Sequence, residues 1–195
     1  MRTKSILLDM DGVVADWHLQ CAKSHGVSLD ELKETFKERP FSLRKALGMG
    51  TERIWEPISA AGPSWWADIP ETPWARRLWN GCRSIAPTYF LTMPSVHPPN
   101  VGDSMAGKFM WLQKFTGNEA FNAYLMGPPK CLCANRHTVL IDDSDDNVRE
   151  FRKAGGMAVL LPSCANSMHT HDGDPCDFVL GSLAEMNSSS TSWRK

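Results

Sequence analysis

The stretch "ILLDMDGVVADW" (residues 6–17) decides the fold, because an apolar run typical of a buried strand leads directly into two aspartates and a glycine. Two like charges placed side by side repel each other, so a buried strand does not normally end in paired carboxylates. We therefore predict a strand over residues 5–9, and we expect Asp9 and Asp11 to belong to a site that relieves their repulsion.

Helix signals dominate the chain between this strand and residue 85. Ser28 and Glu31 lie three residues apart and form a capping-box pattern. A further helix is expected to begin at Thr72 and Pro73, because proline is favoured at the first helical position. The other helices are expected over residues 16–25, 29–38 and 51–61. This part of the sequence shows no convincing strand pattern.

From residue 87 onward, strands alternate with helices, which is typical of a mostly parallel sheet with helices on both faces. The expected strands span residues 88–92, 122–126, 138–142, 157–162 and 177–180, and the expected helices span 104–115 and 145–155. The predicted fold is α/β, with a Rossmann-like (flavodoxin-like) core of residues 1–16 and 86–185. A small helical cap of residues 17–85 is inserted after the first strand, and the polar tail 186–195 is expected to be disordered.

Composition narrows the class of partner. The chain has 195 residues, with 21 basic and 22 acidic ones, so no general electrostatic field favours a polynucleotide or an anionic membrane. Asp9 interrupts the first apolar run too early for a signal peptide, and no stretch is long enough to span a bilayer. The six cysteines are unevenly spaced, unlike a secreted disulfide framework. We expect a cytoplasmic protein that acts on a small molecule, and the sequence leaves a homodimer open.

A second acidic pair, Asp142 and Asp143, follows the expected strand 138–142. Ligands of parallel sheets bind at the carboxyl ends of the strands, so both acidic pairs are expected at the same edge. A calcium loop beginning at Asp9 would need glutamate at its twelfth position, where the chain has Gln20. Carboxylates, water and substrate phosphate are ligands that suit Mg²⁺, so we expect a magnesium site.

Carboxylates beside such an ion can perform phosphoryl transfer. One carboxylate can attack phosphorus and form an aspartyl-phosphate, and a second can protonate the leaving oxygen and then activate water. A hydroxyl group and lysines would hold the equatorial phosphate oxygens. Thr92, Lys108 and Lys130 are the candidates that the chain offers for this purpose.

Four segments, "LLDMDGVVADW", "YFLTMPS", "GKFMWLQKFTG" and "VLIDDSDDN", occur in this order within residues 5–147. In order and spacing they resemble the phosphatases of the haloacid dehalogenase superfamily, and most closely the 5'(3')-deoxyribonucleotidase family. The resemblance implies a Mg²⁺-dependent phosphomonoester hydrolase that dephosphorylates (deoxy)nucleoside monophosphates. Asp9 would be the nucleophile and a metal ligand, and Asp11 the general acid/base whose backbone carbonyl also binds the metal.

The resemblance assigns further residues. Thr92 would hold a phosphate oxygen, Lys130 would be the phosphate-binding lysine and Lys108 a second one. Asp143 would bind the metal directly, whereas Asp142 would bind through water or orient a lysine.

The aromatic side chains of Trp17 and Phe41 would recognise the base. Met93 stands where the family usually has serine, so only its backbone amide would serve the phosphate. Because of such departures, two alternatives stay open: a phosphatase of another small ester, such as a sugar phosphate, and a non-catalytic nucleotide-binding protein.

Overall fold

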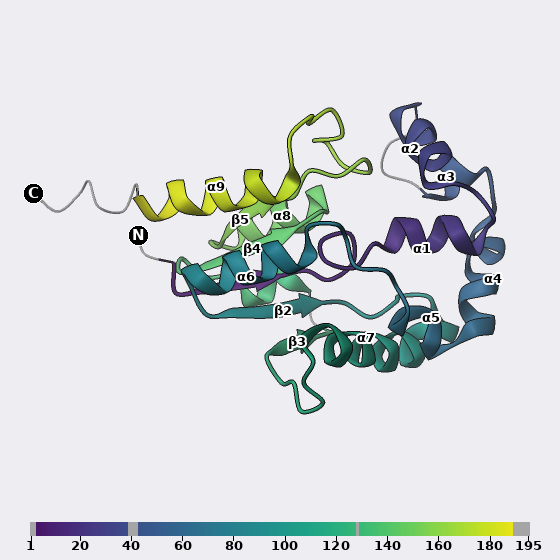
Figure 1. The fold of residues 1–195 in the computed structure, drawn as a ribbon, viewed down its shortest axis with the longest axis horizontal. Coiled ribbons are helices and arrows are strands. Elements are labelled where there is room, and N and C mark those ends of the chain that lie inside the picture. The colour runs from purple at the N-terminus through teal and green to yellow at the C-terminus, as the bar shows by residue number, and fades with distance from the viewer. Residues whose placement is uncertain (1–2, 39–42, 128, 189–195) are drawn as a thin grey trace, which may run out of the picture.

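The computed structural model describes residues 3–38, 43–127 and 129–188. In this part of the chain, five strands form one sheet in the order β3-β2-β1-β4-β5, and every neighbouring pair is parallel (Figure 1). The strands are β1 (Ser5–Leu8), β2 (Thr88–Thr92), β3 (Tyr124–Met126), β4 (Thr138–Asp142) and β5 (Met157–Leu160). The predicted parallel α/β architecture is confirmed.

Strand β1 lies at the centre of the sheet, between β2 and β4. Ile6 is in register with Thr88 on one side and with Val139 on the other. The chain order therefore reverses direction across the sheet at β1, which is where parallel sheets bind their ligands. The residues that follow β1 and its two neighbours meet at this point.

Helices cover both faces of the sheet. On one face, α6 (Ala75–Ile85), α7 (Val101–Thr116) and α9 (Pro175–Ser188) pack against the strands and form the larger core cluster with residues such as Phe90 and Trp79. On the other face, Val148 and Phe151 of α8 (Asp145–Lys153) pack against Leu7 and Leu140. Burial of these apolar side chains on both faces explains why the strands read as continuous apolar runs.

The remaining helices lie beyond the carboxyl ends of the strands (Figure 1). They are α1 (Trp17–Ser24), α2 (Leu29–Glu38), α3 (Leu43–Leu47), α4 (Thr51–Ala61) and α5 (Pro63–Ala67). The predicted capping box begins α2: the Ser28 amide donates to the Glu31 carboxylate at 2.8 Å, and the Glu31 amide donates to Ser28 Oγ at 3.1 Å. Helix α6 packs against β2 and α9, so the end of the predicted cap lies on the sheet.

Two expectations about local structure are wrong. The predicted strand 177–180 is part of helix α9, in which Cys176, Val179 and Leu183 are buried at helical spacing. The helix expected at Thr72 begins at Ala75 instead, because the Thr72 amide and hydroxyl donate to the carbonyls of Val14 (2.9 Å) and Val13 (3.0 Å).

The C-terminal end is ordered further along the chain than predicted. Helix α9 continues through Ser188, so the first three residues of the predicted disordered tail are helical, and residues 189–195 lie outside the described ranges. Between residues 3 and 188, as far as the structure describes them, no helix combines the length and apolar character needed to cross a membrane.

Candidate active site

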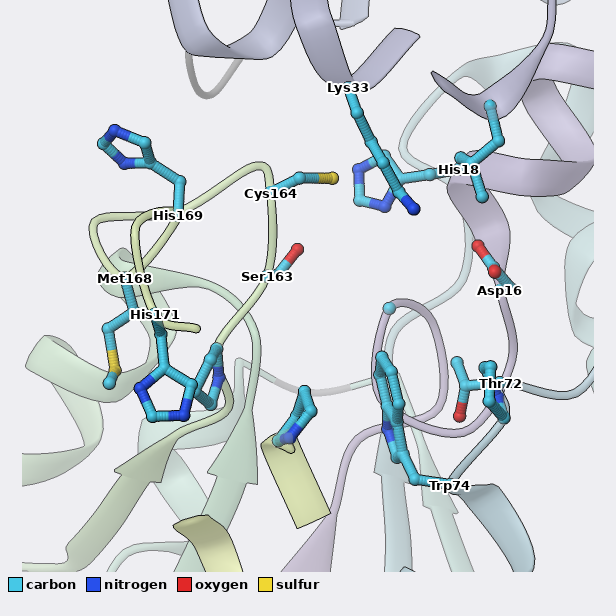
Figure 2. A pocket seen from close by; sticks show the side chains of 15 residues that line it. Asp16, His18, Lys33, Thr72, Trp74, Ser163, Cys164, Met168, His169 and His171 are labelled. Atoms are coloured by element: carbon cyan, nitrogen blue, oxygen red, sulfur yellow. The ribbon is translucent and has the colours of Figure 1, made fainter. Parts of the chain in front are cut away.

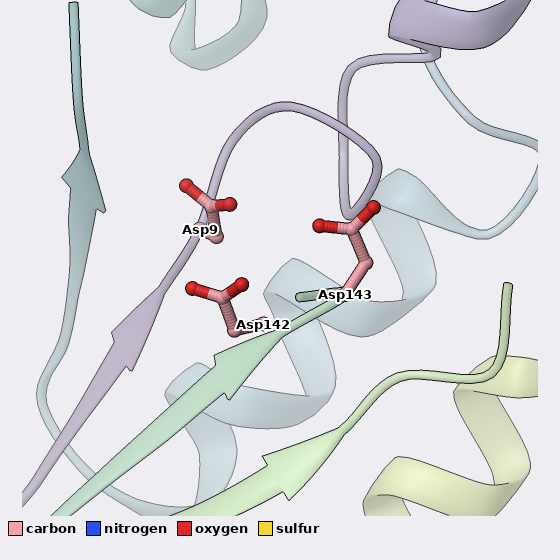
Figure 3. A group of neighbouring side chains, drawn as sticks. All are labelled: Asp9, Asp142 and Asp143. Atoms are coloured by element: carbon pink, nitrogen blue, oxygen red, sulfur yellow. The ribbon is translucent and has the colours of Figure 1, made fainter. Parts of the chain in front are cut away.

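Three carboxylates meet at the carboxyl ends of β1 and β4. Asp9 follows β1, Asp142 is the last residue of β4, and Asp143 comes next; Figure 3 shows their side chains facing a common space. One oxygen from each lies within 4.8 Å of the others. The structure therefore places Asp9 of the first acidic pair next to both members of the second pair.

Lys130 neutralises part of this charge. It begins the short 3₁₀ helix η2 (Lys130–Cys133), and its Nζ lies 2.6 Å from Asp9 Oδ1 and 2.6 Å from Asp142 Oδ2. The lysine is only 4 % exposed. Burial opposes its charge, but the attraction of Asp9 and Asp142 is stronger, and the pKa of Lys130 is raised. The side chain is therefore a permanent cation between two carboxylates.

Lys108 forms an ion pair with Asp11, as Lys130 does with Asp9. It extends from α7, is 2 % exposed, and places Nζ 2.6 Å from Asp11 Oδ2 and 3.2 Å from Thr92 Oγ1. It also donates to the Met93 carbonyl. Each of the two lysines thus forms an ion pair with a different aspartate of the "DMD" segment. Thr92 and Met93 lie beside Lys108.

Asp142 is held by groups of the protein. Besides Lys130, it accepts from the Ser144 amide at 2.9 Å and from Asn147 Nδ2 at 3.1 and 3.3 Å. Burial, followed by repulsion from Asp9, raises the pKa of Asp142 to about 6. With both oxygens engaged, Asp142 is better placed to orient Lys130 than to bind a metal.

In the described part of the chain, the carboxylates of Asp143 and Asp11 make fewer polar contacts than that of Asp142. Burial raises the pKa of Asp143 well above its usual range, and repulsion from Asp142 adds to the shift. Burial also raises the pKa of Asp11, against the attraction of Lys108. The second oxygen of Asp11, Oδ1, is buried without a hydrogen-bond partner among the described residues.

The charges leave a place for a divalent cation. Among the residues that the structure describes, the four carboxylates of Asp9, Asp11, Asp142 and Asp143 face two lysine ammonium groups, Lys108 and Lys130. The excess of two negative charges, the raised pKa values and an all-oxygen donor set fit a hard ion such as Mg²⁺. Asp9 and Asp143 are the carboxylates that would hold it.

A cavity of about 690 Å³ opens beside Asp143. Trp17, His18, Phe36 and Leu43 line it from the cap, and its opposite wall consists of Asp143 together with Ser144, Asp145, Asp146, Ala165 and Ser167. The Trp17 ring packs edge-to-face on Trp65, with centroids 6.3 Å apart, so its orientation is fixed. Phe41, the second expected aromatic, lies outside the described residues.

A second cavity of about 310 Å³, which His18 also lines, lies between the cap and the loop that follows β5 (Figure 2). Lys33 of α2 and Ser163 of this loop point into it, and Trp74 and Gly12 form part of its wall. No local sequence pattern predicts how this loop folds, because distant residues such as Asp143 and Asp145 hold it in place.

The structure resembles several solved structures over nearly the whole chain. The haloacid dehalogenase-like protein of unknown function from Agrobacterium tumefaciens has a TM-score of 0.57 and 14% identity, covering 94% of this chain and 99% of that one. A haloacid dehalogenase-like family hydrolase from Xanthomonas campestris has a TM-score of 0.56 and 8% identity, covering 98% and 95%. A hydrolase from Pseudomonas syringae has a TM-score of 0.56 and 14% identity, covering 94% and 99%.

No protein-family profile matches the sequence, and no curated protein matches it significantly. At sequence identities of 8–14%, the structural similarity establishes the fold alone. The protein therefore has the fold of the haloacid dehalogenase-like hydrolases.

Proposed function

We propose that the protein is a Mg²⁺-dependent phosphomonoester hydrolase that forms an aspartyl-phosphate on Asp9. The observation that carries this proposal is the arrangement at one sheet edge: two carboxylates after β1, two at the end of β4, and a buried lysine beside each aspartate of the first pair. The fold shared with haloacid dehalogenase-like hydrolases supports a hydrolase.

Asp9 is the nucleophile in this proposal. Lys130 Nζ lies 2.6 Å from Oδ1 of Asp9 and orients the carboxylate. An oxygen of Asp9 attacks phosphorus while the bond between phosphorus and the leaving oxygen breaks. The Nζ atom of Lys108 lies 3.2 Å from Oγ1 of Thr92, so the two side chains together can bind oxygens of the transferred phosphoryl group.

Asp11 moves the protons. Burial raises its pKa, which favours the protonated form that can give a proton to the leaving oxygen. In the second step Asp11 takes a proton from water, the water oxygen attacks phosphorus, and the bond to Asp9 breaks with release of phosphate. A substrate phosphate that binds Lys108 would weaken the ion pair between Lys108 and Asp11. Substrate binding itself would therefore favour the protonated form of Asp11.

The metal site would be formed by the carboxylates of Asp9 and Asp143 and the backbone carbonyl of Asp11. A bound Mg²⁺ supplies positive charge that lets a phosphate dianion approach these carboxylates. Asp142 holds Lys130 in place and would contact the metal through water.

For the substrate we propose a (deoxy)nucleoside monophosphate, as in a 5'(3')-deoxyribonucleotidase. The support is the cavity of about 690 Å³ beside Asp143, where the indole of Trp17 faces space large enough for a base. Stacking on one aromatic ring contributes about 1–3 kcal/mol in nucleic-acid readers. The polar wall of the same cavity, with Ser144, Asp146 and Ser167, favours a sugar phosphate as the second candidate.

Initial rates on a panel of substrates test the proposal. Purified protein with Mg²⁺ is given dTMP, dUMP, AMP, glucose 6-phosphate and p-nitrophenyl phosphate. We expect the nucleotides to have the highest kcat/KM, and Asp9→Asn to abolish turnover of every substrate. Tight nucleotide binding with no phosphate release in the wild type would instead indicate a non-catalytic binding protein.

The variant Trp17→Ala tests base recognition separately. It should lower kcat/KM for dTMP by about ten- to a hundredfold, from the loss of stacking, and leave that for p-nitrophenyl phosphate nearly unchanged. Trp55→Ala is the matched control, because Trp55 also lies in the cap but stacks on His97, with ring centroids 5.0 Å apart. Equal losses for both substrates in Trp17→Ala would contradict the assignment.

A further inference from the structure

Asn166 lies in the loop after β5, and its side chain connects this loop to the candidate metal site. It is 1 % exposed, and Nδ2 donates to the backbone carbonyls of Asp143 and Leu161, both at 2.8 Å. Its Oδ1 accepts from the amides of Met168 at 2.9 Å and Ser163 at 3.3 Å. Only this orientation of the amide satisfies all four groups, so the side chain has a single arrangement.

The two carbonyls belong to different strand ends. Asp143 follows the last residue of β4, and Leu161 follows the last residue of β5. Within the strands, ladder hydrogen bonds fix the backbone, but Asp143 lies one residue beyond β4. Asn166 therefore supplies a fixed link for the backbone of Asp143 where the sheet no longer provides one.

Such a link matters because of the charges nearby. One carboxylate oxygen of Asp143 lies within 4.8 Å of oxygens of Asp9 and Asp142, and like charges at this distance repel. If the backbone of Asp143 were free to shift, this repulsion would move its carboxylate away from the other two. The amide of Asn166 is neutral and adds no charge to the cluster.

We propose that Asn166 is a positioning residue for the metal: it fixes the backbone of Asp143 so that the carboxylate stays next to Asp9. This inference rests on the proposed function in so far as Asp143 binds Mg²⁺. Groups that hold metal ligands in place are typically worth about 10–100-fold in metal affinity.

Titration calorimetry with MgCl₂ alone, without substrate, tests the inference. We expect Asn166→Ala to bind Mg²⁺ about 10–100-fold more weakly than the wild type. Asn100→Ala is the matched control: Asn100 is also 1 % exposed and ends the short 3₁₀ helix η1 (Pro98–Asn100) between β2 and α7, but its side-chain amide contacts His97. This control should bind Mg²⁺ as the wild type does, which separates positioning from general loss of packing.

A kinetic measurement adds a readout that a purely structural defect would not give. In Asn166→Ala, turnover should be restored by high Mg²⁺, with KM for the phosphate ester unchanged at saturating metal. If Asn166→Ala does not fold, judged by circular dichroism, Asn166→Ser replaces it in both assays.

Two results would overturn the inference: a folded Asn166 variant that binds Mg²⁺ like the wild type, or an equal loss of affinity in Asn100→Ala. Failure of the proposed function looks different, because the wild-type protein would then bind no Mg²⁺ or release no phosphate.

Discussion

Glycine is required at position 12 for two separate reasons, its backbone conformation and its closeness to Asp143. Its φ of +74° lies in the left-handed region that side chains disfavour. A Cβ built on it would lie 2.0 Å from Asp143 Oδ2, closer than any real contact. The glycine of the "DMDG" segment therefore both turns the chain after Asp11 and makes room for the carboxylate of Asp143.

A comparison of two glycine variants separates these roles. Gly12→Ala and Gly26→Ala both place a side chain at positive φ, but nothing lies within 4 Å of a Cβ at Gly26. We expect each to lose about 1–2 kcal/mol of unfolding free energy in urea. Only Gly12→Ala should also weaken Mg²⁺ binding, by about tenfold or more, because it displaces Asp143. Equal Mg²⁺ affinity in the two variants would argue against this arrangement.

Much of the residue-level site follows from the sequence. Asp9, Thr92 and Asp142 lie at or just after the ends of neighbouring strands, and the topology of parallel sheets places such residues at one edge. Which lysine contacts which aspartate does not follow, because Lys108 and Lys130 arrive from a helix and a short 3₁₀ helix. Asn166 was beyond prediction, since nothing in its own segment marks its contact with a residue 23 positions away.

At the scale of elements, the packing of α5 on α7 decides how Lys108 reaches the site. A Cβ at Gly107, the residue before Lys108, would lie 2.2 Å from the Pro63 carbonyl oxygen and 2.5 Å from Trp66 Cβ. The two helices can approach this closely only because residue 107 has no side chain. The burial of Lys108 beside Asp11 therefore depends on the preceding residue, Gly107.

Gly107→Ala should push α7 away from α5. We expect a loss of about 1–3 kcal/mol of unfolding free energy from overpacking, and a lower kcat because Lys108 moves from Asp11. Gly102→Ala in the same helix is the control: nothing lies within 4 Å of its Cβ, so stability should stay the same or rise. Chemical denaturation and initial rates measure both effects; a neutral Gly107→Ala would show that the helices can separate freely.

Element type was predicted well wherever one pattern was long or its ends were marked, as in α2 with its capping box. The error at residues 177–180 has a physical reason. A short apolar run fits a strand and a buried helix equally well, and α9 buries Cys176, Val179 and Leu183 against the sheet. Packing against distant strands decided the element there.

At the scale of the whole molecule, the excess of negative charge at the sheet edge should couple metal binding to stability. A ligand that binds only the folded state stabilises it by about 2.7 kcal/mol at 100 times its Kd, which raises the Tm of a chain of this size by about 5–10 °C. We expect Mg²⁺ to produce such a rise in scanning calorimetry and EDTA to reverse it. Asp143→Asn should lose most of the rise, and an unchanged response in that variant would place the ion elsewhere.

The central claim is that Asp9 accepts the phosphoryl group. The most direct measurement is reduction with borohydride during turnover, which converts an aspartyl-phosphate to homoserine, followed by peptide mass spectrometry. We predict homoserine at position 9 only when substrate and Mg²⁺ are both present, and none in Asp9→Asn. Phosphate release by the wild type without modification at position 9, together with undiminished turnover in Asp9→Asn, would contradict the account.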